Sequence, residues 1–145
     1  MNEERKTNET LLSKSYTNFK AAELLLNTDL GDEGTLNIAG YLLQQTVELA
    51  LKHIIEMNGF DYPKTHDISV LLDKIDEVCT HKIDDNIIDT LYLMSGTITQ
   101  MESKTRYIKN YLVSKRNISQ VKDLIVKLLP QIDKSFNTTL GRFSD

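Results

Sequence analysis

The chain has 145 residues, a formal net charge of −4, two prolines, six glycines, no tryptophan and one cysteine. The acidic balance argues against a uniformly basic nucleic-acid binder, and a lone Cys79 cannot form an intramolecular disulfide, which favours a reducing cytoplasm. No apolar run approaches the roughly 20 residues of a membrane-spanning helix, so membrane attachment is not expected. The length fits one domain over residues 1–145, with residues 1–7 and 138–145 frayed.

The spacing of apolar residues predicts helices over about residues 8 or 10–26, 35–58, 66–80, 84–102 and 118–136. Thr35 and Thr65 are expected to cap the second and third helices, and Gly59 to end the second. A less regular basic connector, residues 103–117, precedes the last helix, which Pro130 should kink or shorten. The sequence thus predicts an all-α, antiparallel up-and-down bundle of four long helices and a shorter fifth.

The second predicted helix is apolar almost all round except for one polar stripe. At about 100° per residue, the stripe covers an arc of about 100° and contains Asn37, Tyr41, Gln44, Gln45, Glu48 and Lys52. Glu48 lies four residues from both Gln44 and Lys52, so it can reach either neighbour. The stripe is either a polar ladder that closes a gap in the bundle or a dimer contact, or it lines a groove for a base or ribose, with Lys52 near a phosphate.

A second candidate segment is Thr65-His66-Asp67, at the predicted start of the third helix. Free backbone N–H groups and the helix dipole favour anions at such a position. His66 is then a phosphate contact or a proton-transfer group. The alternative is simple capping, with His66 packed against the loop.

A third candidate segment combines Arg106 and Tyr107 with Lys109 and Tyr111. Such a basic and aromatic group suits phosphate binding and stacking, although it could equally be a surface connector. His53 falls on the apolar arc of its helix and is expected to be a core residue. No metal site or cofactor is predicted, because Cys79-Thr-His81 is too sparse a pattern for metal ligation.

Three of these motifs together resemble the HEPN family (higher eukaryote and prokaryote nucleotide-binding domains). The helix Tyr-Leu-Leu-Gln-Gln-Thr-Val-Glu-Leu-Ala-Leu-Lys, residues 41–52, is similar to the family's A-x-x-x-x-Q-Q-A-x-E-x-x-L-K helix. Thr65-His66-Asp67 matches its T-H-D-L helix start, and Arg106-Tyr107 matches an R-Y pair ahead of its last helix. The resemblance spans about residues 10–135.

The resemblance also bears on enzymatic activity. Many ribonuclease members of the family carry an Arg followed four to six residues later by a His on the last long helix, and two chains join to act on RNA. This sequence departs from that pattern, because no histidine lies beyond His81. Catalytic residues therefore stay unknown; if there are any, His66, Arg106 and Lys109 are the candidates.

The expected function is a nucleotide- or substrate-binding helical module that acts beside a separate minimal nucleotidyltransferase, in a toxin–antitoxin-like arrangement implied by the resemblance. Two alternatives remain open: a metal-independent RNA-cleaving toxin with an atypical site, and a purely structural dimerisation bundle. A homodimer is expected, because the second helix has a wide apolar arc and the acidic stretch 56–90 could complement the basic stretch 103–127. The expected location is the cytoplasm.

Overall fold

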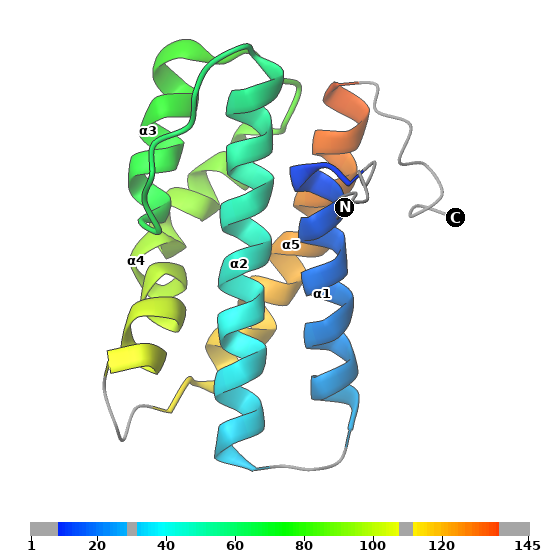
Figure 1. Ribbon diagram of the computed structural model, residues 1–145, viewed down its shortest axis with the longest axis vertical. Coiled ribbons are helices and arrows are strands. Elements are labelled where there is room, and N and C mark those ends of the chain that lie inside the picture. Colours follow the sequence, from blue (N-terminus) through cyan, green and yellow to red (C-terminus); the bar gives the residue numbers. More distant parts are fainter. Residues whose placement is uncertain (1–8, 29–31, 108–111, 137–145) are drawn as a thin grey trace, which may run out of the picture.

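The computed structural model describes residues 9–28, 32–107 and 112–136, without the side chains of residues 105–107. The ends predicted to fray, together with Lys109 and Tyr111, lie outside the described residues. Each regular element within these ranges is a helix (Figure 1): α1 (Leu11–Asn27), α2 (Glu33–Met57), α3 (Ile68–Val78), α4 (Asp85–Tyr107) and α5 (Lys115–Ser135). The predicted all-α bundle is confirmed. None of the described helices is long and apolar enough to cross a membrane.

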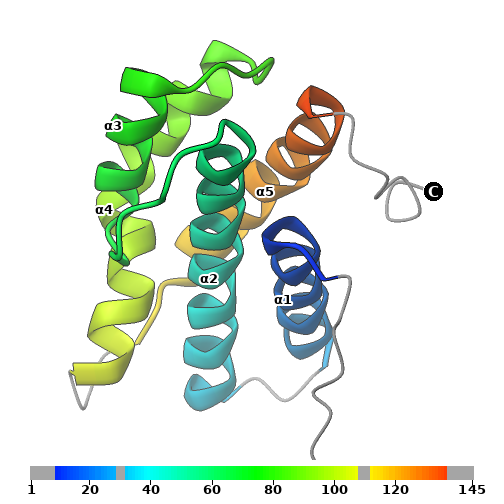
Figure 2. The same cartoon turned by 45° about the horizontal axis from the view of Figure 1, so that its top comes forward.

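Helix α2 is the central element and contacts each of the other four helices. Figure 2 shows α1 on one side of α2, the α3–α4 pair on the other, and α5 passing behind. The helix is buried on several sides, which explains why its sequence is apolar almost all round. Its buried apolar residues are Ala39, Leu43, Val47, Ala50, Leu51, Ile54 and Ile55.

The direction of α3 determines the position of the candidate site. Neighbouring helices run antiparallel in the pairs α1–α2, α3–α4 and α4–α5, but α2 and α3 run in the same direction (Figure 1). The extended segment 60–67 makes this possible, because it returns along α2 before α3 begins. At the far end of α3, the N–H of Thr80 donates to Asn58 Oδ1 over 2.9 Å. The return brings His66 beside the middle of α2, within 2.8 Å of Glu48.

Two predicted helix caps were wrong by two or three residues. Asp32 caps α2, since its Oδ1 accepts from the Thr35 N–H over 2.7 Å. Asp67 caps α3 by accepting from the Ser69 N–H over 2.9 Å, whereas Thr65 holds the loop by accepting from the Asp67 N–H over 3.0 Å. In both cases an aspartate stands immediately before the first helical residue, and a charged oxygen is a stronger acceptor for these amides than a threonine hydroxyl.

The last two helices are longer than expected. α4 continues to Tyr107, so Arg106 lies on the last turn of a helix and not in a connector. Residues 103–107 contain no glycine or proline, and nothing there interrupts the helix. Pro130 lies inside α5 without ending it, because it is on the exposed side, where water can hydrate the Val126 carbonyl that lacks a helical donor. The end of α2 is as predicted, with Gly59 at a φ of 83°.

The first polar residue of the α2 stripe has a structural role. Asn37 Oδ1 accepts a hydrogen bond from the N–H of Val113 over 2.9 Å, which fixes the segment just before α5. This segment passes close to α2 at Gly40, where a Cβ atom would come within 3.2 Å of the Val113 side chain. The stripe is therefore divided: its beginning holds the 112–114 segment, and its middle faces the loop that leads to α3.

Candidate functional site

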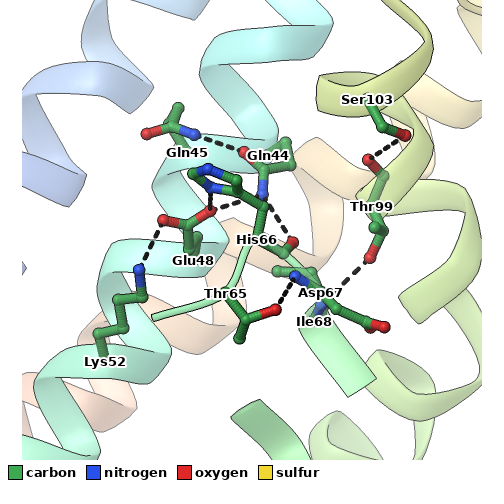
Figure 3. Close-up of polar contacts among 10 residues, drawn as sticks. All are labelled: Gln44, Gln45, Glu48, Lys52, Thr65, His66, Asp67, Ile68, Thr99 and Ser103. Atoms are coloured by element: carbon green, nitrogen blue, oxygen red, sulfur yellow. Dashed lines mark hydrogen bonds and ion pairs between the residues drawn. The ribbon is translucent and has the colours of Figure 1, made fainter. Parts of the chain in front are cut away.

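A buried carboxylate organises the middle of the α2 stripe (Figure 3). Glu48 is 3% exposed, and its Oε1 accepts from Gln44 Nε2 over 3.0 Å and lies 2.8 Å from His66 Nδ1. Its Oε2 forms an ion pair with Lys52 Nζ at 3.0 Å. Gln44 also donates to the backbone carbonyl of His66 over 3.2 Å and accepts from Gln45 Nε2 over 2.7 Å. Two helical turns of α2 and the loop before α3 thus share one hydrogen-bond network.

Glu48 is ionised in this network. Burial raises the pKa of the carboxyl group, but hydrogen bonds from Gln44, His66 and Lys52, together with the Lys52 charge, outweigh burial and hold the pKa below its usual value of 4.5. The Lys52 side chain is 11% exposed, so this ion pair is largely out of water. Removing one partner from such a pair would leave a buried charge uncompensated.

An aromatic ring missed in the sequence analysis lies next to the network. Lys52 Nζ is 5.1 Å from the centroid of the Tyr62 ring, a cation–π contact. Tyr62 borders a hollow of about 380 Å³ that is also lined by Glu56, Phe60, Asp61 and Lys64. Tyr62 and His66 consequently flank the Glu48–Lys52 ion pair. Little in the sequence indicated this role, because a tyrosine before a proline in a short loop can point either to solvent or to a neighbouring helix.

The start of α3 is less suited to anions than the sequence predicted. The N–H of Ile68 donates to Thr99 Oγ1 on α4 over 3.1 Å, and the N–H of Ser69 donates to Asp67. Two of the amides expected to hold an anion therefore already have partners inside the protein, and Asp67 adds a negative charge beside them. Any anion at this position depends on side chains such as His66, whose side chain is 56% exposed.

The structure brings two of the three predicted segments together. At the α2–α3 junction, polar side chains of α2 lie next to the loop residues Thr65 and His66 (Figure 3). The α2 residues are Gln44, Gln45, Glu48 and Lys52. The third segment lies further along α4: Arg106 is seven residues beyond Thr99, which corresponds to about 10 Å along the helix axis. The side chains of Arg106 and Tyr107, and the whole of Lys109 and Tyr111, lie outside the described part of the chain. Their convergence on the site stays a prediction.

His53 is a core residue, as the sequence indicated. It is 2% exposed, its ring meets Phe136 edge-on at 6.3 Å between centroids, and within the described ranges neither ring nitrogen has a hydrogen-bond partner. Burial lowers the pKa of His53 from its usual value of 6.5, because the imidazolium form would lose its hydration. The described residues also contain no group of three or more side chains that could hold a metal ion.

We expect His53 to make the fold sensitive to mild acid. Because its pKa is lower in the folded than in the unfolded chain, the unfolded chain binds the proton more readily. The free energy of unfolding should be highest above pH 6.5 and should fall as the pH drops from 6.5 toward the lower pKa of the folded state. His53→Leu should flatten this dependence in urea titrations at pH 7.5, 6.5 and 5.5. His81→Asn, at a half-exposed histidine, should keep the wild-type dependence of the free energy of unfolding on pH. If His53→Leu also keeps this dependence, His53 is not its cause.

A separate groove of about 510 Å³ lies between α4 and α5 and was not predicted. It is lined by residues from both helices and the turn before α4, among them Asp84, Ile87, Thr90, Met94, Leu124 and Lys127. Gln131 bridges its end by donating to Asp84 Oδ2 over 3.0 Å and accepting from the Asp84 N–H over 2.8 Å. No polar network comparable to that around Glu48 links the described residues there, so the α2–α3 junction remains the candidate site.

Comparison with known proteins bears on the family. The family model for the HEPN domain matches residues 8–128, which is most of the chain and includes all five helices in whole or in part. Searches among curated proteins and among solved structures find no match. HEPN proteins are helical modules related to nucleotides and RNA, and many are dimeric. On the strength of this match, the chain belongs to the HEPN family.

Proposed function

We propose that this protein is a nucleotide- or substrate-binding HEPN module whose ligand binds at the α2–α3 junction. The observation that carries the proposal is the 2.8 Å contact between His66 Nδ1 and the buried carboxylate of Glu48. It holds an exposed imidazole in a fixed orientation beside an ion pair and an aromatic ring. Gln44 and Glu48 are themselves buried, so their role would be to position His66 rather than to touch the ligand.

The surroundings of this network supply what a nucleotide requires. The hollow next to Tyr62 contains a second aromatic ring, Phe60, and the ammonium group of Lys64. A base could stack on these rings while Lys64 and His66 contact a phosphate. Thr65, Gln45 and the predicted segment around Arg106 would complete the contacts. The finer role, beside a separate minimal nucleotidyltransferase in a toxin–antitoxin-like pair, follows from the family resemblance.

Nucleotide binding should stabilise the folded protein. At a nucleotide concentration about ten times Kd, mass action adds about 1.4 kcal/mol to the free energy of unfolding, which should raise Tm by roughly 3–6 °C. Differential scanning fluorimetry with adenine and guanine nucleotides at millimolar concentration measures this rise. Arg106→Ala should abolish the rise in Tm. Lys82→Ala, at an exposed residue between α3 and α4, should leave the rise intact. A rise that survives Arg106→Ala would remove Arg106 from the site.

We also propose that the protein acts as a homodimer. The support for this proposal is the family, whose members are often dimeric. Light scattering at micromolar concentration should give about twice the chain mass of 16.6 kDa. A monomer at that concentration would contradict the dimer and any site shared between two chains.

RNA cleavage remains a second candidate. It is favoured by the Glu48–His66 contact, since a general base needs an oriented imidazole with one nitrogen exposed. The family's spacing of Arg and His is missing, so the site would be atypical. Degradation of single-stranded RNA by the purified protein, stopped by His66→Ala but not by His81→Asn, would favour this function over binding alone.

A further inference from the structure

The three histidines of the chain differ in how their ring nitrogens are used. His53 is buried without a hydrogen-bond partner among the described residues. His81 Nδ1 accepts from the N–H of Ile83 over 3.1 Å, so that nitrogen cannot carry a hydrogen. His66 Nδ1 faces the carboxylate of Glu48 at 2.8 Å. The three rings therefore respond differently to a proton.

In His66 the site of proton exchange is fixed. An ionised carboxylate only accepts hydrogen bonds, so Nδ1 carries a hydrogen whether the ring is neutral or charged. A proton can then be gained or lost only at Nε2, on a side chain that is 56% exposed. Every contact of the Glu48 network stays in place during the exchange. In His81, by contrast, a proton on Nδ1 would break the bond from Ile83, and in His53 the charge would be buried.

With the His66 ring neutral, the charged groups around it do not favour a phosphate overall. Glu48 and Lys52 neutralise one another on α2, and the first two amides of α3 are already bonded. On the loop itself Lys64 stands between Asp61 and Asp67 in the sequence, α3 has its first charged side chain at Asp73, and α4 carries Glu102 and Lys104 beyond Thr99. A proton on Nε2 adds a positive charge and a second N–H donor to the exposed His66 ring, with Glu48 as the counter-ion behind it, so the imidazolium can pair directly with a phosphate.

We propose that His66 is a proton-coupled phosphate-binding residue: docking of a nucleotide's phosphate draws one proton from solution onto Nε2, and the imidazolium pairs with the phosphate. Glu48 is the positioning residue, because it keeps Nδ1 as the donor in both states. No covalent bond changes; one proton moves from the buffer to the protein for each phosphate bound. The inference rests on the proposed function and specifies the chemistry of its ligand and its dependence on pH.

The fixed hydrogen on Nδ1 can be measured in the free protein. Long-range proton–nitrogen NMR spectra distinguish the two neutral forms of an imidazole. At a pH where both exposed rings are neutral, His66 should carry its hydrogen on Nδ1 and His81 on Nε2. In Glu48→Gln, His66 should lose its strict preference while His81 keeps its own. A hydrogen on Nε2 of His66 in the wild type would overturn the inference, whatever the ligand.

Proton uptake on binding is measured by calorimetry with adenosine 5′-monophosphate as the probe. Titrations in two phosphate-free buffers of different ionisation enthalpy, at a pH where NMR shows free His66 to be neutral, give the number of protons taken up. The wild type should take up close to one proton per nucleotide, and adenosine, which lacks the phosphate, should cause no uptake. His66→Asn should remove the uptake and weaken binding by roughly tenfold. His81→Asn is the matched control and should behave as the wild type.

The outcomes separate the inference from the proposed function. Binding of the probe without proton uptake in the wild type, or uptake that persists in His66→Asn, would overturn the inference and leave nucleotide binding standing. No heat and no rise in Tm with any nucleotide would overturn the proposed function, and the inference with it. Uptake confined to chains that contain His66 would support both.

Discussion

Glu48→Ala should lower the free energy of unfolding by about 3 kcal/mol, because it leaves the ammonium group of Lys52 largely buried without its counter-ion. The change also removes the acceptor for Gln44 and His66. Urea titrations at pH 7.5 measure the loss directly, and thermal melts should show Tm lower by roughly 6–12 °C.

The control for this loss is Glu56→Ala, an exposed glutamate two turns further along α2, which should change stability by no more than about 0.5 kcal/mol. The loss should also depend on pH. The pKa of Glu48 is lowered in the folded state, so its contribution is complete above 4.5 and disappears as the pH falls through the folded pKa. Glu48→Ala and the wild type should therefore converge in strong acid. A neutral Glu48→Ala at pH 7.5 would mean that the carboxylate is not part of a buried network.

The double change Glu48→Leu with Lys52→Met should restore stability without restoring binding. Replacing both members of a buried ion pair by apolar side chains of similar size is often neutral or stabilising, so the free energy of unfolding should return to within about 1 kcal/mol of the wild type. His66 loses the acceptor that orients its ring. Urea titrations and the nucleotide-induced rise in Tm, measured on the same sample, separate the two effects.

The double variant distinguishes a structural ladder from a binding site. If the network serves only to close a gap between α2 and α3, the stable double variant should bind nucleotides as well as the wild type does. If the network positions His66 for a phosphate, the variant should fold normally and show at most a small rise in Tm. A full rise in Tm would mean that nucleotides bind without the Glu48–His66 contact, and the contact would then have a structural role only.

Helix periodicity predicted the helices and the contacts of Glu48 with Gln44 and Lys52 along α2. Glu48 lies four residues from both Gln44 and Lys52, and side chains at that spacing meet on a helix regardless of the rest of the fold. The burial of α2 was also predicted from its sequence, because its apolar surface is too wide for one neighbouring helix to cover. The contact between Glu48 and His66, 18 residues apart, was not predicted, because no local rule connects the two.

The features that sequence reasoning missed depend on tertiary contacts. Nothing local shows that segment 60–67 returns along α2, or that Thr99 of α4 would occupy the first amide of α3. Thr65 and Asp67 both accept hydrogen bonds from nearby amides, and the sequence did not show that α3 begins directly after Asp67, the stronger acceptor of the two. The length of α4 was underestimated because a basic, polar helix end lacks the apolar period that identifies helices.

A nucleotide whose phosphate contacts His66 at the α2–α3 junction should change the NMR signals of the His66 ring. An NMR titration of the wild-type protein with adenosine 5′-monophosphate tests this contact most directly, because the imidazole signals of His53, His66 and His81 report from the core, the candidate site and a distant surface. We expect saturable shifts of the His66 ring and of the Gln45 side-chain amide, with the His53 and His81 signals unchanged. Saturable shifts confined to the α4–α5 groove, or no shift at His66 at millimolar nucleotide, would contradict this expectation.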